Sequence, residues 1–214
     1  MDGGPYGMTL WVVKLGTSLL RGDTAATIEG YASGLAAAMR RGDQVVLVTS
    51  GAVGLGCQQL RLPRRPDAVV ALQAAAATGQ GYLMALYERA MAVHGISVAQ
   101  VLLTRSDLVD RRRYQNASGT LQQLLAWGVL PVINENDALS SAELRFGDND
   151  TLSALVAAAV GAHQLLLLTD VDRLYSSDPR RNANAQPIPD CHHPRHPSHL
   201  EPGAGVGDPG GRGG

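Results

Sequence analysis

Short apolar runs recur along the chain, and small or polar residues end each of them. Three runs, at 10–16, 44–51 and 164–170, are continuous rather than alternating and are rich in leucine or β-branched residues. Such runs are typical of strands that are buried on both faces, as in parallel sheets. Two further strand candidates lie at 96–104 and 129–137.

The stretches between these runs are rich in alanine and leucine and have helical spacing, at 24–42, 68–95, 113–128 and 151–162. The first stretch closes with Arg40, Arg41 and Gly42, the basic last turn and glycine stop that favour a helix C-terminus. The second stretch is either one long helix or two helices broken between Gly79 and Gly81.

The alternation of strands and helices predicts an α/β fold, a three-layer αβα sandwich with a mainly parallel central sheet. In open sheets of this kind, ligands bind at the carboxyl ends of the strands. Polar and glycine residues of this chain gather at those ends, at 14–18, 49–52, 134–137 and 169–170. We therefore expect the functional site along this edge of the sheet.

The composition fits an ordinary globular protein, with 45% hydrophobic residues, 17% charged residues and a net charge of -1 over 214 residues. This length allows one large domain or two small ones. The near-neutral charge argues against nucleic acid as the main partner.

The two cysteines, Cys57 and Cys191, lie far apart and form no Cys-x-x-Cys motif. We expect neither a zinc ribbon nor a disulfide framework, and interpret both as reduced thiols of a cytosolic protein. The first residues do not show the charged and apolar regions of a signal peptide. Since no apolar run reaches about 18 uninterrupted residues, we expect no membrane span.

The character of the chain changes after residue 186, where Pro, Gly and His become dense and periodicity ends. We expect a folded domain at 8–186 and a loop or disordered tail at 187–214. The tail holds four histidines that nothing in the sequence orients, and we expect no metal-ligating residues there. They are His192, His193, His196 and His199.

Lys14 ends the first apolar run and is followed by Gly16, Thr17 and Ser18. A cation beside free backbone N–H groups favours an anion such as phosphate, although a solvent-facing lysine on an edge turn is the plain alternative. No Walker loop occurs in the chain.

A second glycine turn follows the next run, at Ser50, Gly51 and Ala52. It suits an anion in the same way, and its plain alternative is close packing of a strand against a helix.

Asp148, Asn149 and Asp150 stand side by side where an apolar helix begins, and helix capping alone explains such residues. Together with Asn134 and Asp137 they form an acidic and amide set of the wrong sign to hold phosphate directly. The set suits the ammonium group of an amino acid, magnesium, or the orientation of a neighbouring lysine.

Six motifs occur in the order and approximate spacing found in the glutamate 5-kinases, a branch of the amino acid kinase family. They are "VVKLGTS", "VTSGA", "LLTRSDLVDRRRYQNA", "PVINENDA", "GDNDTLSALVA" and "LLLLTDVDRLYSSDPR". The resemblance runs over about 10–180. "KLGTS" and "TSGA" occur across the wider family, whereas "NENDA" plus "GDND" is specific to this branch.

The resemblance implies ATP-dependent phosphorylation of the side-chain carboxylate of L-glutamate to glutamyl 5-phosphate, the first step of proline biosynthesis. It implies ATP and Mg2+ as cofactors and a cytoplasmic homo-oligomer. No nucleic-acid or membrane partner is expected. Kinases acting on N-acetylglutamate or aspartate are disfavoured, because Asp137 and Asp148 suit a free ammonium group.

The resemblance also implies roles for individual residues. Lys14 would pair with the transferring phosphate, and Asp150 would orient Lys14. The residues that would hold glutamate are Ser50, Gly51, Ala52, Asn134, Asp137, Asp148 and Asn149. The residues that would hold the nucleotide are Lys14, Gly16, Thr17, Ser18, Thr169 and Asp170.

Two departures from the family pattern concern the nucleotide side. Arg173 stands where relatives carry glycine. A downstream G-T-G-G-M-x-T-K segment is missing, and Arg212 is the only cation in the glycine-rich end of the chain. We interpret the tail as truncated or frame-shifted, which sequencing beyond the stop codon would test. The alternative function is therefore an impaired remnant that binds glutamate or associates with intact subunits, with an exposed sheet edge.

Overall fold

The computed structural model describes residues 8–20, 22–139 and 149–189. The chain divides into two compact units, the first ending at Leu168 and the second beginning at Thr169. Each unit is described by itself.

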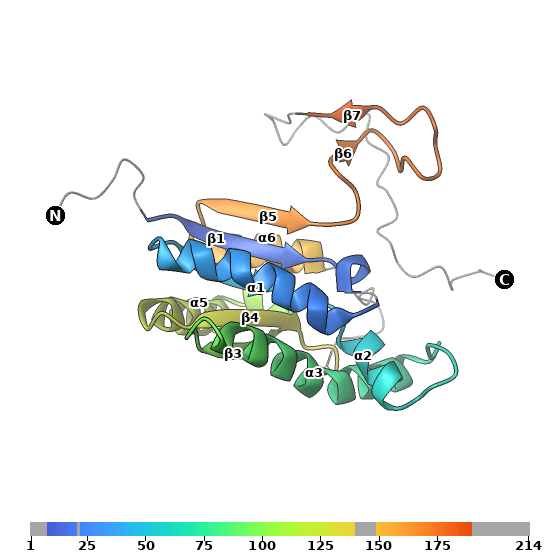
Figure 1. The fold of residues 1–214 in the computed structure, drawn as a ribbon, viewed down its shortest axis with the longest axis horizontal. Coiled ribbons are helices and arrows are strands. Elements are labelled where there is room, and N and C mark those ends of the chain that lie inside the picture. The colour runs from blue at the N-terminus through green and yellow to red at the C-terminus, as the bar shows by residue number, and fades with distance from the viewer. Residues whose placement is uncertain (1–7, 21, 140–148, 190–214) are drawn as a thin grey trace. The chain divides into compact units, whose positions relative to one another are not determined.

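The first unit is built on a five-stranded sheet in which every pair of neighbours is parallel. Its order is β3-β4-β2-β1-β5, with β1 between β2 and β5 (Figure 1). The strands are β1 (Leu10–Leu15), β2 (Gln44–Val48), β3 (Val98–Leu103), β4 (Leu130–Glu135) and β5 (Gln164–Leu168). The helices are η1 (Thr17–Leu20), α1 (Thr24–Arg40), α2 (Ala52–Gln59), α3 (Val69–Ala92), α4 (Arg105–Val109), α5 (Arg111–Ala126) and α6 (Asn149–Val160).

Helices cover both faces of this sheet, which confirms the predicted αβα sandwich. Alternate residues of β1 and β2 face opposite layers, as the strand period of two requires. Val13 and Leu47 belong to the core cluster with α1, α2 and α3, whereas Val12 and Val46 belong to the cluster with α4, α5 and α6. Figure 1 shows α1 and α3 on one side of the sheet and α5 and α6 on the other.

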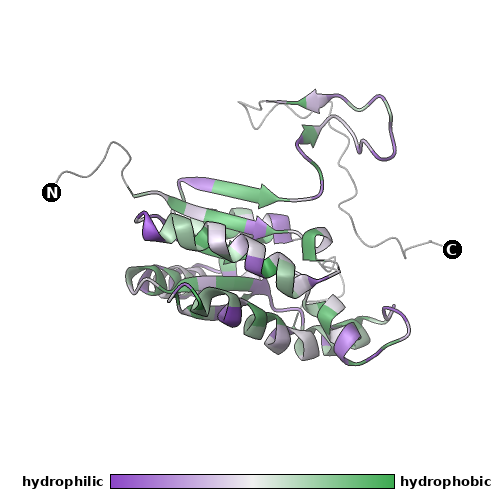
Figure 2. Cartoon of the chain, viewed as in Figure 1, coloured by the Kyte–Doolittle hydropathy of each residue, from purple (hydrophilic) through white to green (hydrophobic). Residues whose placement is uncertain are grey.

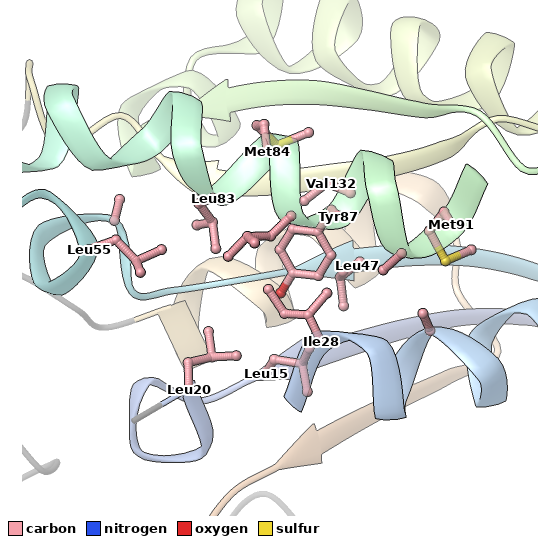
Figure 3. Close-up of a cluster of buried hydrophobic side chains, with 14 of the residues drawn as sticks. Leu15, Leu20, Ile28, Leu47, Leu55, Leu83, Met84, Tyr87, Met91 and Val132 are labelled. Carbon is pink, nitrogen blue, oxygen red and sulfur yellow. The ribbon is translucent and has the colours of Figure 1, made fainter. Parts of the chain in front are cut away.

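Tyr87 lies at the centre of the larger core cluster and is almost completely buried. Figure 3 shows its ring between α3 and α1, among Leu47, Leu83 and Ile28. Its hydroxyl group lies 2.6 Å from Oγ1 of Thr49, so the one polar atom of this ring has a partner. Burial raises the pKa of Tyr87, and the side chain stays neutral.

All five predicted strands are present, but the prediction that the run at 164–170 is buried on both faces is wrong. Leu165, Leu166 and Leu167 of β5 are 36%, 42% and 45% exposed. In the part of the chain that the structure describes, β5 pairs only with β1 and is an edge strand. Figure 2 shows the hydrophobic colour along most of β5.

The predicted helices are also present, and α1 ends as expected. Gly42 has φ +94° and its N–H donates to the carbonyl of Met39, which is the left-handed stop of a helix. The stretch 68–95 forms one helix, α3, without a break at its glycines. The short helices α2 and α4 were not predicted.

Two glycines allow α2 and α3 to cross at backbone contact. A Cβ atom on Gly56 would collide with the carbonyl oxygen of Ala75, and one on Gly79 would collide with the carbonyl oxygen of Ala52. Gly79 is therefore a point of close helix packing rather than a helix break.

Among the described helices, α3 alone is long and apolar enough to cross a membrane by length and composition. Its buried residues, Leu83 and Met91 among them, pack into the core beside the sheet. A core helix passes the same test, so this finding gives weak support to a membrane span.

The second unit contains a short antiparallel pair, β6 (Leu174–Tyr175) and β7 (Pro187–Ile188). The stretch from 187 was expected to be a loop, and β7 differs from that expectation. The pair joins residues on both sides of the boundary expected after residue 186, which stays a prediction.

We predict opposite effects of alanine at two neighbouring glycines of α3. Gly79→Ala should destabilise the chain by about 1 to 3 kcal/mol, because its Cβ atom would force α2 and α3 apart. Gly81→Ala should stabilise it by about 0.5 to 1 kcal/mol, since this position is exposed and open and alanine favours helix. Urea unfolding measures both changes, and equal effects would contradict the close crossing.

Candidate active site

The central feature of the candidate site is an ion pair between Lys14 of β1 and Asp150 of α6. The ammonium nitrogen of Lys14 lies 2.7 Å from Oδ1 of Asp150. The lysine side chain is 10% exposed and the aspartate side chain 61% exposed, so the pair opens to solvent on the carboxylate side. A buried ammonium group needs such a partner, because its desolvation is costly.

The sheet and α6 bring together two residues that lie far apart in the sequence. Lys14 is the last residue but one of β1 and lies in register with Val48 of β2 and Leu167 of β5. Asp150 lies in the first turn of α6, which packs against β1. Lys14 is also the only lysine of the sequence. The other side chains that carry a permanent positive charge are all arginines.

Gly16 gives the lysine its space. A Cβ atom at this position would lie 3.3 Å from Nζ of Lys14 and 3.2 Å from the carbonyl oxygen of Leu168. The N–H of Gly16 donates to that same carbonyl over 3.1 Å. In this structure the N–H of Gly16 therefore joins the ends of β1 and β5, and its role toward a phosphate stays a prediction.

Asn149 stands next to Asp150 and ties three elements together. Its Nδ2 donates to the carbonyl of Thr49 (2.6 Å), to Oγ of Ser50 (3.0 Å) and to Oδ1 of Asn134 (3.0 Å). Asn149 thus links Ser50 and Asn134, and all three are predicted glutamate-binding residues. The plain helix-cap interpretation does not account for these contacts, which run sideways to β2 and β4.

The other end of this amide group has a different environment. Oδ1 of Asn149 is buried and accepts no hydrogen bond from the described residues. Buried polar atoms are rarely left without a partner, because the lost hydration is not replaced. An unpaired acceptor beside an ion pair indicates a place for a donor from a ligand.

Gly51 shapes the approach of α2 to the site. It is the N-cap of α2 with φ +102°, a left-handed conformation that strongly favours glycine. A Cβ atom there would also lie 3.3 Å from Cδ1 of Leu20. Ser50 joins the polar cluster, and Gly51 and Ala52 form the strand-to-helix turn. The anion interpretation of this turn stays a prediction.

Asp137 follows β4 by two residues, and its surroundings favour the protonated, uncharged form of its carboxyl group. Burial, followed by the negative charge of Glu135, raises its pKa to about 7, and the positive charge of Arg65 opposes the shift. Glu135 is itself 5% exposed and was not predicted as a site residue. Its place inside the "NENDA" motif is the feature of the sequence from which it could have been predicted.

Three other predicted residues are Asp148, Thr169 and Asp170. Asp148 lies outside the described residues. Thr169 and Asp170 belong to the second unit, where Oγ1 of Thr169 donates to Oδ1 of Asp170 over 3.2 Å. Arg180 in turn pairs with Asp170 over 3.4 Å.

No metal cluster is found in the described part of the chain, where no three His, Cys, Asp or Glu side chains could hold one ion together. Two surface grooves, of about 490 and 210 Å³, are lined by α5 and by the amino ends of β2 and β4. None of the polar residues described above lines either groove.

Comparison with known proteins identifies the family of this chain. The family model described as "Amino acid kinase family" matches residues 9–193, most of the chain. The chain belongs to the amino acid kinase family.

Relatives within the amino acid kinase family are highly similar along nearly the whole chain. The glutamate 5-kinase of Synechococcus sp. (strain CC9902) is 91% identical over 207 residues, which are 97% of this chain and 58% of that protein. The glutamate 5-kinase of Prochlorococcus marinus (strain MIT 9313) is 67% identical over 211 residues, again 97% and 58%. The chain thus spans 58% of the length of these relatives.

Solved structures of the amino acid kinase family share the fold. Carbamate kinase from Giardia lamblia bound to AMP-PNP matches with a TM-score of 0.57 and 14% identity, over 85% of this chain and 79% of that one. Aspartate kinase from Synechocystis matches with a TM-score of 0.53 and 18% identity, over 83% and 31%. At these identities the likeness concerns the fold alone.

The raised pKa of Asp137 predicts a pH-dependent effect of Asp137→Asn. The folded state holds the proton up to about pH 7, whereas an unfolded aspartate loses it near pH 4, so wild-type stability falls as the pH rises between these values. Asp137→Asn removes this loss. Its stability relative to wild type should therefore rise by about 1 to 3 kcal/mol from pH 5 to pH 8.

Urea unfolding at both pH values measures this effect. Asp67→Asn is the control, because its side chain is 79% exposed and solvated in either state. A relative stability of Asp137→Asn that stays constant between pH 5 and pH 8 would contradict the burial of an uncharged Asp137.

Proposed function

We propose that this chain carries the glutamate-binding and phosphoryl-transfer machinery of a glutamate 5-kinase. The reaction transfers the γ-phosphoryl group of ATP to the side-chain carboxylate of L-glutamate and forms glutamyl 5-phosphate, the first step of proline biosynthesis. The observation that carries the proposal is the Lys14–Asp150 ion pair beside the unpaired Oδ1 of Asn149. Asp150, which holds the cation, and Asn149, which offers the unpaired acceptor, are thus consecutive residues at the start of α6.

Lys14 supplies positive charge to the transferring phosphoryl group. Phosphoryl transfer depends on alignment and on charge-neutralising donors more than on covalent help from the protein. Asp150 holds the ammonium group at 2.7 Å and so fixes its position before ATP arrives. Such preorganised charge acts strongly where water is partly excluded.

The acceptor side binds the ammonium group of glutamate. Oδ1 of Asn149 accepts one of its three N–H donors, and the carboxylate of Asp137 supplies an opposite charge. Ser50 and Asn134 hold Asn149 in place through its Nδ2. We assign Asp148 to the same group on the resemblance.

The nucleotide side uses the turn after β1. Thr17 and Ser18 begin η1, and the first N–H groups of a helix have no acceptor within it, so they suit phosphate oxygens. Thr169 and Asp170 complete the nucleotide site on the resemblance. On the resemblance, magnesium would accompany ATP and neutralise charge on its phosphates.

A second candidate function is glutamate binding without transfer. It is favoured by the contacts of Asn149, which join residues of the acceptor side within 49–150 and include no residue of the nucleotide side. Such a chain would bind glutamate or associate with intact subunits.

We place either form in the cytoplasm and expect a homo-oligomer, both on the resemblance. Neither nucleic acid nor a membrane is needed for the reaction.

The activity of the chain is tested by mixing it with ATP, magnesium and glutamate and trapping the acyl phosphate as hydroxamate. Lys14→Ala should lower the rate by about 100- to 1,000-fold, since it removes a charge that stabilises the transition state. Asp150→Asn should cost less, about 10- to 100-fold, because the lysine remains but is less well oriented. Asp67→Asn is the control and should keep the wild-type rate.

The outcome separates the two candidate functions. Wild-type product at the level of Lys14→Ala would exclude catalysis by this chain. Glutamate binding without ATP binding, measured by calorimetry, would then establish the second candidate.

Glutamate affinity should depend on pH through Asp137. Below about pH 7 this carboxylate takes a proton and no longer pairs with the ammonium group. Calorimetry should therefore show about tenfold weaker binding at pH 6 than at pH 8 for wild type, and weak binding without this dependence for Asp137→Asn. Equal wild-type affinities at the two pH values would remove Asp137 from the proposed site.

A further inference from the structure

We propose that Gln80 of α3 is a positioning residue that fixes the direction of the Asn149 amide group through Asn134. It thereby makes the site present an oxygen rather than an NH2 group to its ligand. Gln80 has no hydrogen bond to Asn149 and is linked to it only through Asn134. The consequence for glutamate rests on the proposed function, whereas the positioning itself does not.

Four side-chain amides from four elements form a hydrogen-bonded relay that runs in one direction. Asn149 Nδ2 donates to Asn134 Oδ1 over 3.0 Å, and Asn134 Nδ2 donates to Gln80 Oε1 over 2.8 Å. Gln80 Nε2 then donates to Gln100 Oε1 over 3.0 Å. The relay therefore links α6, β4, α3 and β3.

The direction of the Asn134 amide is set by its neighbours. Asn134 Oδ1 also accepts from the backbone N–H of Glu135 over 2.9 Å. If the Asn134 amide turned over, its NH2 group would face two donors, from Glu135 and Asn149. Gln80 supplies the acceptor that the NH2 group of Asn134 needs in the observed direction.

Burial makes this choice consequential. Asn134 is 2% exposed, Asn149 is 3% exposed and Gln80 is 8% exposed. Water has little access to these groups, so an amide that lost its partner would pay the full cost of desolvation. The relay therefore keeps its direction as long as each amide keeps its hydrogen-bond partner.

The end of the relay determines what the site recognises. Nδ2 of Asn149 already faces three acceptors, on Thr49, Ser50 and Asn134. Its Oδ1 is left as a buried acceptor, which attracts an ammonium group. A reversed amide would present donors at the same place and would disfavour an amino-group ligand.

The backbone under Gln80 is held by the helix crossing described above. Gly79, its neighbour, lies against the carbonyl oxygen of Ala52 at the start of α2. This contact limits the movement of α3 at the point where Gln80 enters the relay. Gln80 thus starts from a fixed position, as a positioning residue must.

Two substitutions at Gln80 separate positioning from folding. Gln80→Met keeps the length of the side chain and removes both ends of the amide. Gln80→Glu keeps an oxygen that accepts from Asn134. Gln122→Met, at an exposed position of α5, is the matched control.

The first readout is NMR of the side-chain NH2 groups without ligand, assigned with an Asn149→Asp variant. In Gln80→Met the NH2 protons of Asn149 should shift and exchange with water about tenfold faster, although Gln80 does not touch Asn149. Gln80→Glu should restore most of the wild-type signal. Unchanged Asn149 signals in a folded Gln80→Met variant would overturn the positioning role.

The second readout is calorimetry with L-glutamate. Gln80→Met should bind about tenfold more weakly than wild type, and Gln80→Glu and Gln122→Met within about threefold of it. Wild-type affinity in Gln80→Met would overturn the role in recognition. Absence of glutamate binding by wild type would refute the proposed function instead, and the NMR result would still decide whether Gln80 positions Asn149. Urea midpoints show that each variant remains folded.

Discussion

The parallel direction of all five strands is the constraint on which the rest of the first unit depends. Parallel strands require a crossover after each strand, and these crossovers supply the helices that bury both sheet faces. The same direction places the carboxyl ends of β1, β2, β4 and β5 on one edge. Lys14, Ser50, Asn134 and the start of α6 meet there although the sequence separates them widely.

Close approach of backbones at glycine is the second requirement of this arrangement. Gly56 and Gly79 allow α2 and α3 to cross without side chains between them, and Gly16 leaves room for the Lys14 ammonium group. Cores with interlocked contacts of this kind tolerate added volume poorly. The alanine-rich composition of α3 is consistent with such dense packing, because small side chains let a helix lie close to its neighbours.

The sequence predicted those features that arise from local pattern. Apolar runs, three of them continuous, identified all five strands, and the basic end and glycine stop identified the end of α1. The exposure of β5 was missed, because it depends on the order of strands in the sheet, which the strand's own residues do not encode. The short helices α2 and α4 were missed because eight and five residues show too little periodicity.

The candidate site divides in the same way. The motifs identified Lys14 and Asp150, whose pairing at 2.7 Å is a tertiary contact between two recognised segments. Gln80 gave no signal, because a single glutamine in an alanine-rich helix is an ordinary residue until its neighbours in space are known. The engagement of the Gly16 N–H by Leu168 was also hidden, since it depends on the strand order beside β1.

The solitary lysine has a practical consequence. An amine-selective reagent has only one side chain to modify in this chain, Lys14, besides the terminal amino group. Because that ammonium group is mostly buried and held by Asp150, its reactivity reports on the opening of the ion pair rather than on surface chemistry in general. A spectroscopic or isotopic tag introduced by such chemistry would mark the mouth of the site without any engineering of the remaining sequence.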